Sequence, residues 1–231
     1  MKKFIFALTT LFISTISFAQ KDVTLFLGIP VDGTKADMIQ KLKAKGFTYD
    51  ATKDVLYGQF NGRNSNLYVA ANNGKVYRIM VCDHDVISET DIRIRFNTLC
   101  RQFEQNKKYT PQNLLGGYEI EESEDISYEM TIHNKRYQAA YYQVSEEDFE
   151  KSIDSFDVEK YMEENKNQYS EEKLKKLDEK ELGRTVVNLF DSMMKQFSHK
   201  SVWFMINEHY GKYYISIFYD NELNKANGED L

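Results

Sequence analysis

Apolar residues recur at helical spacing in several stretches of the chain, and three helix starts share one signal. In each, a Ser or Thr is followed three residues later by Asp, so that the hydroxyl can accept a hydrogen bond from a free amide of the first turn. The pairs are Thr34 with Asp37, Ser88 with Asp91, and Ser145 with Asp148. The apolar spacing predicts helices over about 35–45, 89–106 and 184–198.

Between these helices, short apolar runs are separated by turn residues such as Asn61-Gly62 and Asn72-Asn73-Gly74, which suit tight antiparallel hairpins. The expected strands are 55–60, 67–71, 76–83, 118–121, 126–133 and 136–144, followed by a closing hairpin over 201–220. Helices with one apolar stripe, interleaved with hairpins, predict an α+β fold in which helices pack on one face of antiparallel sheet. The other face is then left to water or to a partner.

Internal sequence similarity indicates two related helix-plus-hairpin units in tandem. The segment FNTLCRQF at 96–103 aligns with FDSMMKQF at 190–197, and GKVYRIMVCD at 74–83 aligns with GKYYISIFYD at 211–220. We expect a first α+β unit over 20–110 and a second over 111–231. The second contains a charge-rich excursion over 146–182, which we interpret as one or two solvated helices that form either a connector or a mobile arm.

Residues 1–19 read as a secretory signal peptide, with two lysines, an apolar run and small residues before cleavage near Ala19. The run is too short for a membrane span, and we expect a periplasmic or secreted protein. The remaining chain has 28 basic and 36 acidic side chains without a dense basic stripe, which argues against nucleic acid as a partner.

Cys82 and Cys100 are the two cysteines. An oxidising compartment permits a disulfide between them, and two buried free thiols are the alternative.

Three stretches resemble chemical motifs without satisfying them, and we expect no cofactor and no metal. Gly28–Lys35 has the glycine spacing of a phosphate-binding loop but the transposed order Thr34-Lys35, so it reads as a turn into a helix. The residues Cys82 to Asp85 are competent metal ligands, but adjacent residues of a strand point to alternate sides. The acidic segment from Asp220 fails the EF-hand pattern. No nucleophile motif assigns catalytic residues.

The closing hairpin offers the candidate binding residues. If it turns at His209-Tyr210, one face carries Trp203, Met205, Tyr214 and Phe218, while the opposite face carries core residues. Aromatic side chains give large contact areas and dominate binding hot spots. Burial of both faces between layers is the alternative.

Three segments carry a resemblance to a known group of proteins: FLGIPVDGTKADMIQKLKAKGF, ISYEMTIHNKRYQAAYYQ and YYISIFYDNELNKANGEDL. They resemble a family of secreted proteins of unknown function from gut-type Gram-negative bacteria. The layout also resembles the beta-lactamase inhibitor protein type, in which an open sheet face grips a partner.

The sequence thus favours a non-catalytic binding module that holds a protein partner in an inhibitor-like manner. A glycan-binding module is the alternative, followed by a hydrolase with a carboxylate or Cys/His site.

Overall fold

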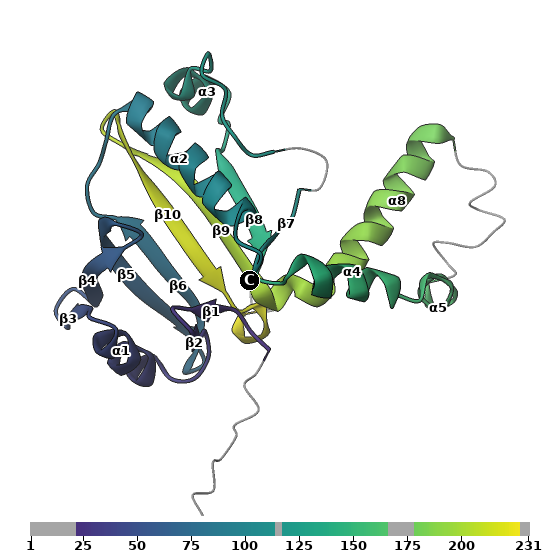
Figure 1. Cartoon of the computed structure of the whole chain (residues 1–231), viewed down its shortest axis with the longest axis horizontal. Helices are drawn as coiled ribbons and strands as arrows, with labels where there is room; N and C mark the ends of the chain where they lie inside the picture. The colour runs from purple at the N-terminus through teal and green to yellow at the C-terminus, as the bar shows by residue number, and fades with distance from the viewer. Residues whose placement is uncertain (1–21, 114–116, 166–177, 227–231) are drawn as a thin grey trace, which may run out of the picture.

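The computed structural model describes residues 22–113, 117–165 and 178–226 of the 231-residue chain (Figure 1). The predicted signal peptide and part of the charged excursion lie outside these ranges. The strands are β1 (Leu25–Phe26), β2 (Ile29–Pro30), β3 (Thr48–Asp50), β4 (Val55–Phe60), β5 (Arg63–Asn72), β6 (Lys75–Asp83), β7 (Thr110–Pro111), β8 (Gln138–Tyr142), β9 (Ser201–His209) and β10 (Lys212–Asp220). The α-helices are α1 (Lys35–Ala44), α2 (Glu89–Glu104), α3 (Ile126–Ile132), α4 (Glu146–Asp154), α5 (Val158–Glu164) and α8 (Glu179–Met194), and the 3-10 helices are η1 (Lys195–Lys200) and η2 (Glu222–Asn224).

Eight strands form one antiparallel sheet in the order β3-β4-β5-β6-β10-β9-β8-β7, and β1 and β2 form a separate small hairpin. The predicted α+β class is therefore confirmed. Strands β6 and β10 pair although they are far apart in the sequence. The N-terminal and C-terminal strands therefore belong to one sheet.

Helices α1 and α2 lie on the same side of this sheet (Figure 1). Met38, Ile39 and Leu42 of α1 and Phe96 and Leu99 of α2 pack into one core with alternate side chains of the strands. The predicted caps are confirmed, because the hydroxyls of Thr34, Ser88 and Ser145 accept hydrogen bonds from the amides three residues later.

The segment 126–133 was expected as a strand and is instead the helix α3. Asp125 caps it by accepting a hydrogen bond from the amide of Tyr128. Its alternating apolar residues do not face a sheet: Ile126 is buried, whereas Tyr128 and Ile132 are more than half exposed. Residues 118–121 are also not a strand, and the short β7 pairs with β8 in their place.

One pair of aligned segments, 74–83 and 211–220, lies side by side in the fold. Strands β6 and β10 pair antiparallel, with Val81 opposite Ile217, and both follow a two-residue turn in the left-handed region, Asn73-Gly74 in one hairpin and Tyr210-Gly211 in the other. The turn at Tyr210-Gly211 lies one residue later than expected, which leaves the predicted faces of the hairpin unchanged. The tandem relationship and the unit boundary at 110 stay predictions. Helix α2 precedes that boundary in the sequence but packs on β9 and β10, which follow it.

Helices α4, α5 and α8 project away from the sheet (Figure 1). A small apolar cluster of Val144, Phe149, Met194 and Phe197 lies where α4 starts and α8 ends, separate from the main core. Of the expected excursion over 146–182, the described part is helical, and residues 166–177 lie outside the described ranges. No helix in the described residues is long and apolar enough to span a membrane.

Candidate functional site

The sheet has one face that neither α1 nor α2 covers. We call it the open face; the residues of its strands that point away from the helices include Tyr57, Tyr68, Arg78, Met80, Cys82, Trp203, Met205, Tyr214, Ser216, Phe218 and Asp220, with the polar Asn66 and Asn207 beside them. Within the described residues, the side-chain hydrogen-bond and ring partners of this set are residues of the strands, not of helices. Among the residues named here, Arg78 and Asp220 are charged.

A row of large side chains crosses four adjacent strands of the open face. Tyr68 on β5 lies opposite Met80 on β6, Met80 lies opposite Phe218 on β10, and Phe218 lies opposite Trp203 on β9. Directly opposed residues of antiparallel strands have side chains in contact distance. The row is therefore continuous and uncharged in a chain of which 29% of the residues are charged.

Asp220 fixes the end of this row. Its carboxylate accepts two hydrogen bonds from Arg78, at 2.6 and 2.7 Å, and one from the indole nitrogen of Trp203 at 3.0 Å. The hydrogen bonds that Arg78 donates to Asp220 raise the pKa of Arg78 above its usual value. The guanidinium also lies 5.0 Å from the ring centroid of Phe218, so both charges are satisfied within the face.

All four residues predicted from the closing hairpin lie on the open face, and their role in binding stays a prediction. Trp203, Met205 and Tyr214 are half-buried, while Phe218 is only 8% exposed. Sequence reasoning missed Tyr57, Tyr68 and Met80, although the alternation around Tyr68 carried the same signal. These residues join the candidate set only because β6 pairs with β10.

Tyr57, Tyr68 and Tyr214 bring hydroxyl groups to the open face. No hydrogen bond from the hydroxyl of Tyr57, Tyr68 or Tyr214 is found among the described residues. Burial, and then the neighbouring Cys82, raises the pKa of Tyr68 and of Tyr214. Both hydroxyls are therefore neutral near pH 7 and can donate a hydrogen bond to a ligand.

The two cysteines are free, and the bridge considered between Cys82 and Cys100 is not formed. Cys82 lies on the open face, where its sulfur is 3.2 Å from the Ser216 hydroxyl. Cys100 is buried in the core on the helix side, so the sheet separates the two thiols. Burial raises the pKa of Cys82 and raises the pKa of Cys100 to about 12.

The segment from Cys82 to Asp85 has structural partners. The Asp83 carboxylate is 3.3 Å from a guanidinium nitrogen of Arg95, and the His84 ring bonds to the Asn66 amide. No cluster of three or more His, Cys, Asp or Glu side chains suited to a metal occurs among the described residues. In the glycine-rich segment, Leu27 and Gly28 form the turn between β1 and β2, and Thr34 caps α1.

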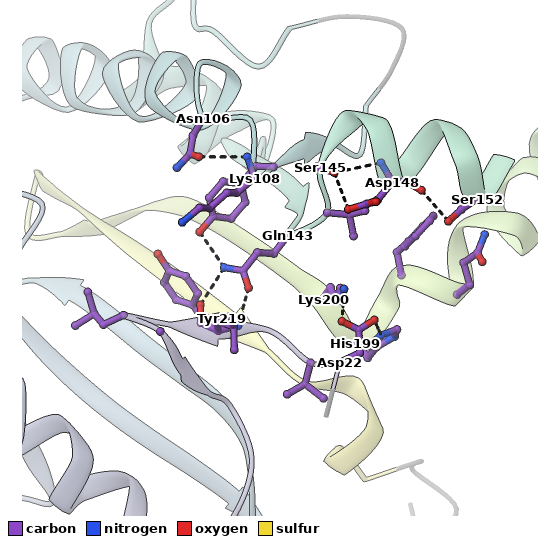
Figure 2. A pocket seen from close by; sticks show the side chains of 18 of the residues that line it. Asp22, Asn106, Lys108, Gln143, Ser145, Asp148, Ser152, His199, Lys200 and Tyr219 are labelled. Carbon is purple, nitrogen blue, oxygen red and sulfur yellow. Dashed lines mark hydrogen bonds and ion pairs between the residues drawn. The ribbon is translucent and has the colours of Figure 1, made fainter. Parts of the chain in front are cut away.

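A second feature, which sequence reasoning missed, is a cleft of about 1060 Å³ on the helix side of the molecule (Figure 2). Its lining comes from the N-terminal arm (residues 22–28), the segment after α2, the start of α4, and η1. Phe60, Tyr109, Phe197 and Tyr219 contribute rings to it. No spacing in the sequence connects these segments, so only the fold could reveal the cleft.

Gln143 crosses the centre of the cleft (Figure 2). Its amide oxygen accepts from the backbone amide of Leu25 at 2.6 Å, and its amide nitrogen donates to the Leu25 carbonyl and to the Tyr109 hydroxyl. Burial raises the pKa of Tyr109. Burial, and then the neighbouring Tyr109 side chain, raise the pKa of Tyr219 well above its usual value. Both phenols are therefore neutral at ordinary pH.

Comparison with known proteins gives no relative for this chain. No family model, no curated protein and no solved structure matches it. The resemblance to a secreted family therefore stays a prediction.

Proposed function

We propose that this protein is a non-catalytic binding module of the periplasm or extracellular space, and that its open face holds a protein partner through a row of uncharged aromatic and methionine side chains. The observation that carries the proposal is the uncharged row of Tyr68, Met80, Phe218 and Trp203 across four strands. Tyr, Trp, Phe and Met are enriched at protein interfaces, whereas Lys, Glu and Asp are depleted.

The ring geometry favours a protein over a glycan. The rings of Trp203 and Phe218 stack with centroids 3.9 Å apart and planes within 14°. Each ring therefore covers a face of the other, and the face that a sugar would need for stacking is reduced. A protein partner can instead pack against the ring edges and methionine side chains and accept hydrogen bonds from the tyrosine hydroxyls.

A Cys/His hydrolase is less well supported. A nucleophilic cysteine acts as the thiolate, and its pKa is normally lowered by its surroundings. Burial instead raises the pKa of Cys82, and the imidazole of His84 bonds to Asn66 rather than to the thiol.

The test uses a photo-crosslinking amino acid at position 68 or 214, with position 94 as the matched control. Ile94 is 60% exposed on α2, on the helix side of the sheet. Irradiation of the envelope of the producing cells should yield a crosslinked protein from positions 68 and 214 but not from 94.

The captured partner is then purified and titrated. The Tyr68→Ala/Tyr214→Ala double variant should bind at least about tenfold more weakly than the wild type, because contacts at hot spots cost more than 1 kcal/mol each. The Ile94→Ala variant should bind as the wild type does. Equal affinity of the double variant, or no crosslink from the open face, would reject the proposal.

A further inference from the structure

The cleft contains a lysine and a neighbouring histidine, and the counterion of the lysine is exposed to solvent. His199 and Lys200 end η1, and both side chains are only 19% exposed. Lys200 forms an ion pair with the carboxylate of Asp22, and the His199 ring lies 3.8 Å from it. Asp22 is 79% exposed and is the only carboxylate in ion-pair range of Lys200 among the described residues. Figure 2 shows the three side chains meeting at one end of the cleft.

The arm that carries Asp22 is held by other residues. Thr24 is fully buried, and its amide and hydroxyl both donate to the His199 carbonyl. Val23 is 3% exposed. The backbone amide and the carbonyl of Leu25 both form hydrogen bonds with the side-chain amide of Gln143. The Asp22 carboxylate can therefore leave Lys200 without unseating the arm. An ion pair with so exposed a partner contributes little free energy, and a second anion can replace it.

Beside polar side chains such as Gln143 and Ser145, the cleft offers aromatic surface for an apolar body. Rings of Phe60, Tyr109, Phe197 and Tyr219 line it, and a smaller recess of about 270 Å³ adjoins it and adds Phe103 and Ile217. Binding sites for small molecules are mostly apolar, with a few polar groups that fix the orientation of the ligand.

The charges of the cleft indicate a single negative charge on that ligand. Besides Asp22 and Lys200, the lining contains Lys108 and Asp148, one of each sign. When Asp22 is displaced, one unbalanced lysine charge remains, with His199 beside it as a hydrogen-bond donor or as a second cation.

We propose that the cleft binds a small amphipathic anion, with its charged group on Lys200 and His199 in place of Asp22 and its apolar body against the aromatic lining. This site lies on the helix side of the sheet and is independent of the partner surface proposed for the open face. Asp22 acts as an internal competitor for it.

The probe is anilinonaphthalene sulfonate, an apolar fluorophore with one negative charge, and its neutral analogue N-phenylnaphthylamine is the matched control. The Asp22→Ala variant should bind the sulfonate about threefold more tightly, because an exposed competing ion pair is removed. The Lys200→Gln variant should bind it about tenfold more weakly, because a partly buried charged partner is lost. The neutral analogue should bind all variants equally.

Two controls separate this site from others. Lys212→Gln removes an exposed lysine at the distant β9–β10 turn and should leave sulfonate binding unchanged. Tyr68→Ala/Tyr214→Ala alters the open face and should also leave it unchanged, so that dye bound there is recognised. Each variant is first compared with the wild type by near-ultraviolet circular dichroism, because loosened proteins bind this dye nonspecifically.

Sulfonate affinity that Asp22→Ala leaves unchanged or lowers would overturn the proposal. So would equal effects of the variants on the neutral analogue. The Asp22→Ala result stands even if Lys200→Gln fails to fold, because Asp22 is exposed and carries no core contact.

Discussion

The indole of Trp203 lies flat against the ring of Phe218, with centroids 3.9 Å apart. The two residues are directly opposite each other on β9 and β10. On a sheet face without covering helices, this stacking shields apolar surface that would otherwise be fully exposed to water. The Trp203 nitrogen also donates to Asp220, so the aromatic pair and the Arg78–Asp220 ion pair form one unit.

Asp220→Ala should destabilise the protein by about 2–3 kcal/mol, because it leaves the Arg78 guanidinium unpaired and removes the acceptor of Trp203. The free energy of unfolding in urea measures the loss, with the emission of the single tryptophan as the signal. The matched control is Glu119→Ala, since Glu119 also accepts two hydrogen bonds from an arginine, Arg101, but both side chains are about half exposed. The control should lose much less stability; equal losses would mean that the Asp220 cluster is not buried.

The reactivity of the thiols should differ between the two sides of the sheet. Burial raises the pKa of Cys100 to about 12, and the side chain is fully buried, so Cys100 should not react with a disulfide reagent at pH 8 in the folded protein. Cys82 is partly exposed and should react first, although slowly, because its pKa is also raised. In denatured protein without reductant, two thiols per chain should react with the disulfide reagent. A lower count would indicate a disulfide.

The cap at Thr34 should contribute about 1 kcal/mol to the stability of the fold. The Thr34 hydroxyl accepts from the Asp37 amide at 3.2 Å, and Thr34→Ala leaves that amide without its partner. Thr34→Ser keeps the hydroxyl and is the matched control in thermal unfolding. Because Thr34 contacts neither the open face nor the cleft, Thr34→Ala should leave binding at both unchanged.

Much of the fold follows from local pattern, and its failures have local causes. The β5–β6 and β9–β10 hairpins were predictable because alternation and turn residues agree. Helix α3 was mistaken for a strand because Ile126, Tyr128, Met130 and Ile132 alternate by chance over a seven-residue segment. The competing signal was Asp125, which caps the helix.

The sites were predictable only where one hairpin contains them. Trp203 and Tyr214 share a face because of the register of a single hairpin, whereas Tyr68 joins them only through the pairing of β6 with β10. The cleft depends on Asp22, Tyr109, Gln143 and Lys200, which come from four distant segments. Such proximity is a property of the tertiary fold, and no periodicity in the sequence encodes it.

Stability should fall in acid partly through Glu124. Hydrogen bonds from Lys135, and then from Tyr137, lower the pKa of Glu124 in the folded protein. A carboxyl group with a lowered folded pKa contributes stability above its unfolded pKa, about 4.3, and loses it as the pH falls through the folded pKa. Wild type should therefore exceed Glu124→Gln in stability at pH 6 and lose that advantage progressively as the pH falls below about 4.3, measured by urea unfolding. Tyr137→Phe, which removes one donor, should show a smaller change with pH; a constant difference between wild type and Glu124→Gln would contradict the assignment.

The two hairpin turns predict a stabilising substitution. Tyr210 has a φ of 49°, close to the 47° of Asn73 at the matching position of the β5–β6 hairpin. A left-handed residue costs tyrosine more than asparagine, and Asn-Gly is the favoured pair for a two-residue hairpin turn. Tyr210 is 92% exposed, so its replacement removes little packing.

Tyr210→Asn should raise the free energy of unfolding by roughly 0.5–1 kcal/mol, whereas the reciprocal change Asn73→Tyr should lower it by a similar amount. Opposite signs in urea unfolding would support the equivalence of the two hairpins; a loss of stability in Tyr210→Asn would show that the turns are not interchangeable.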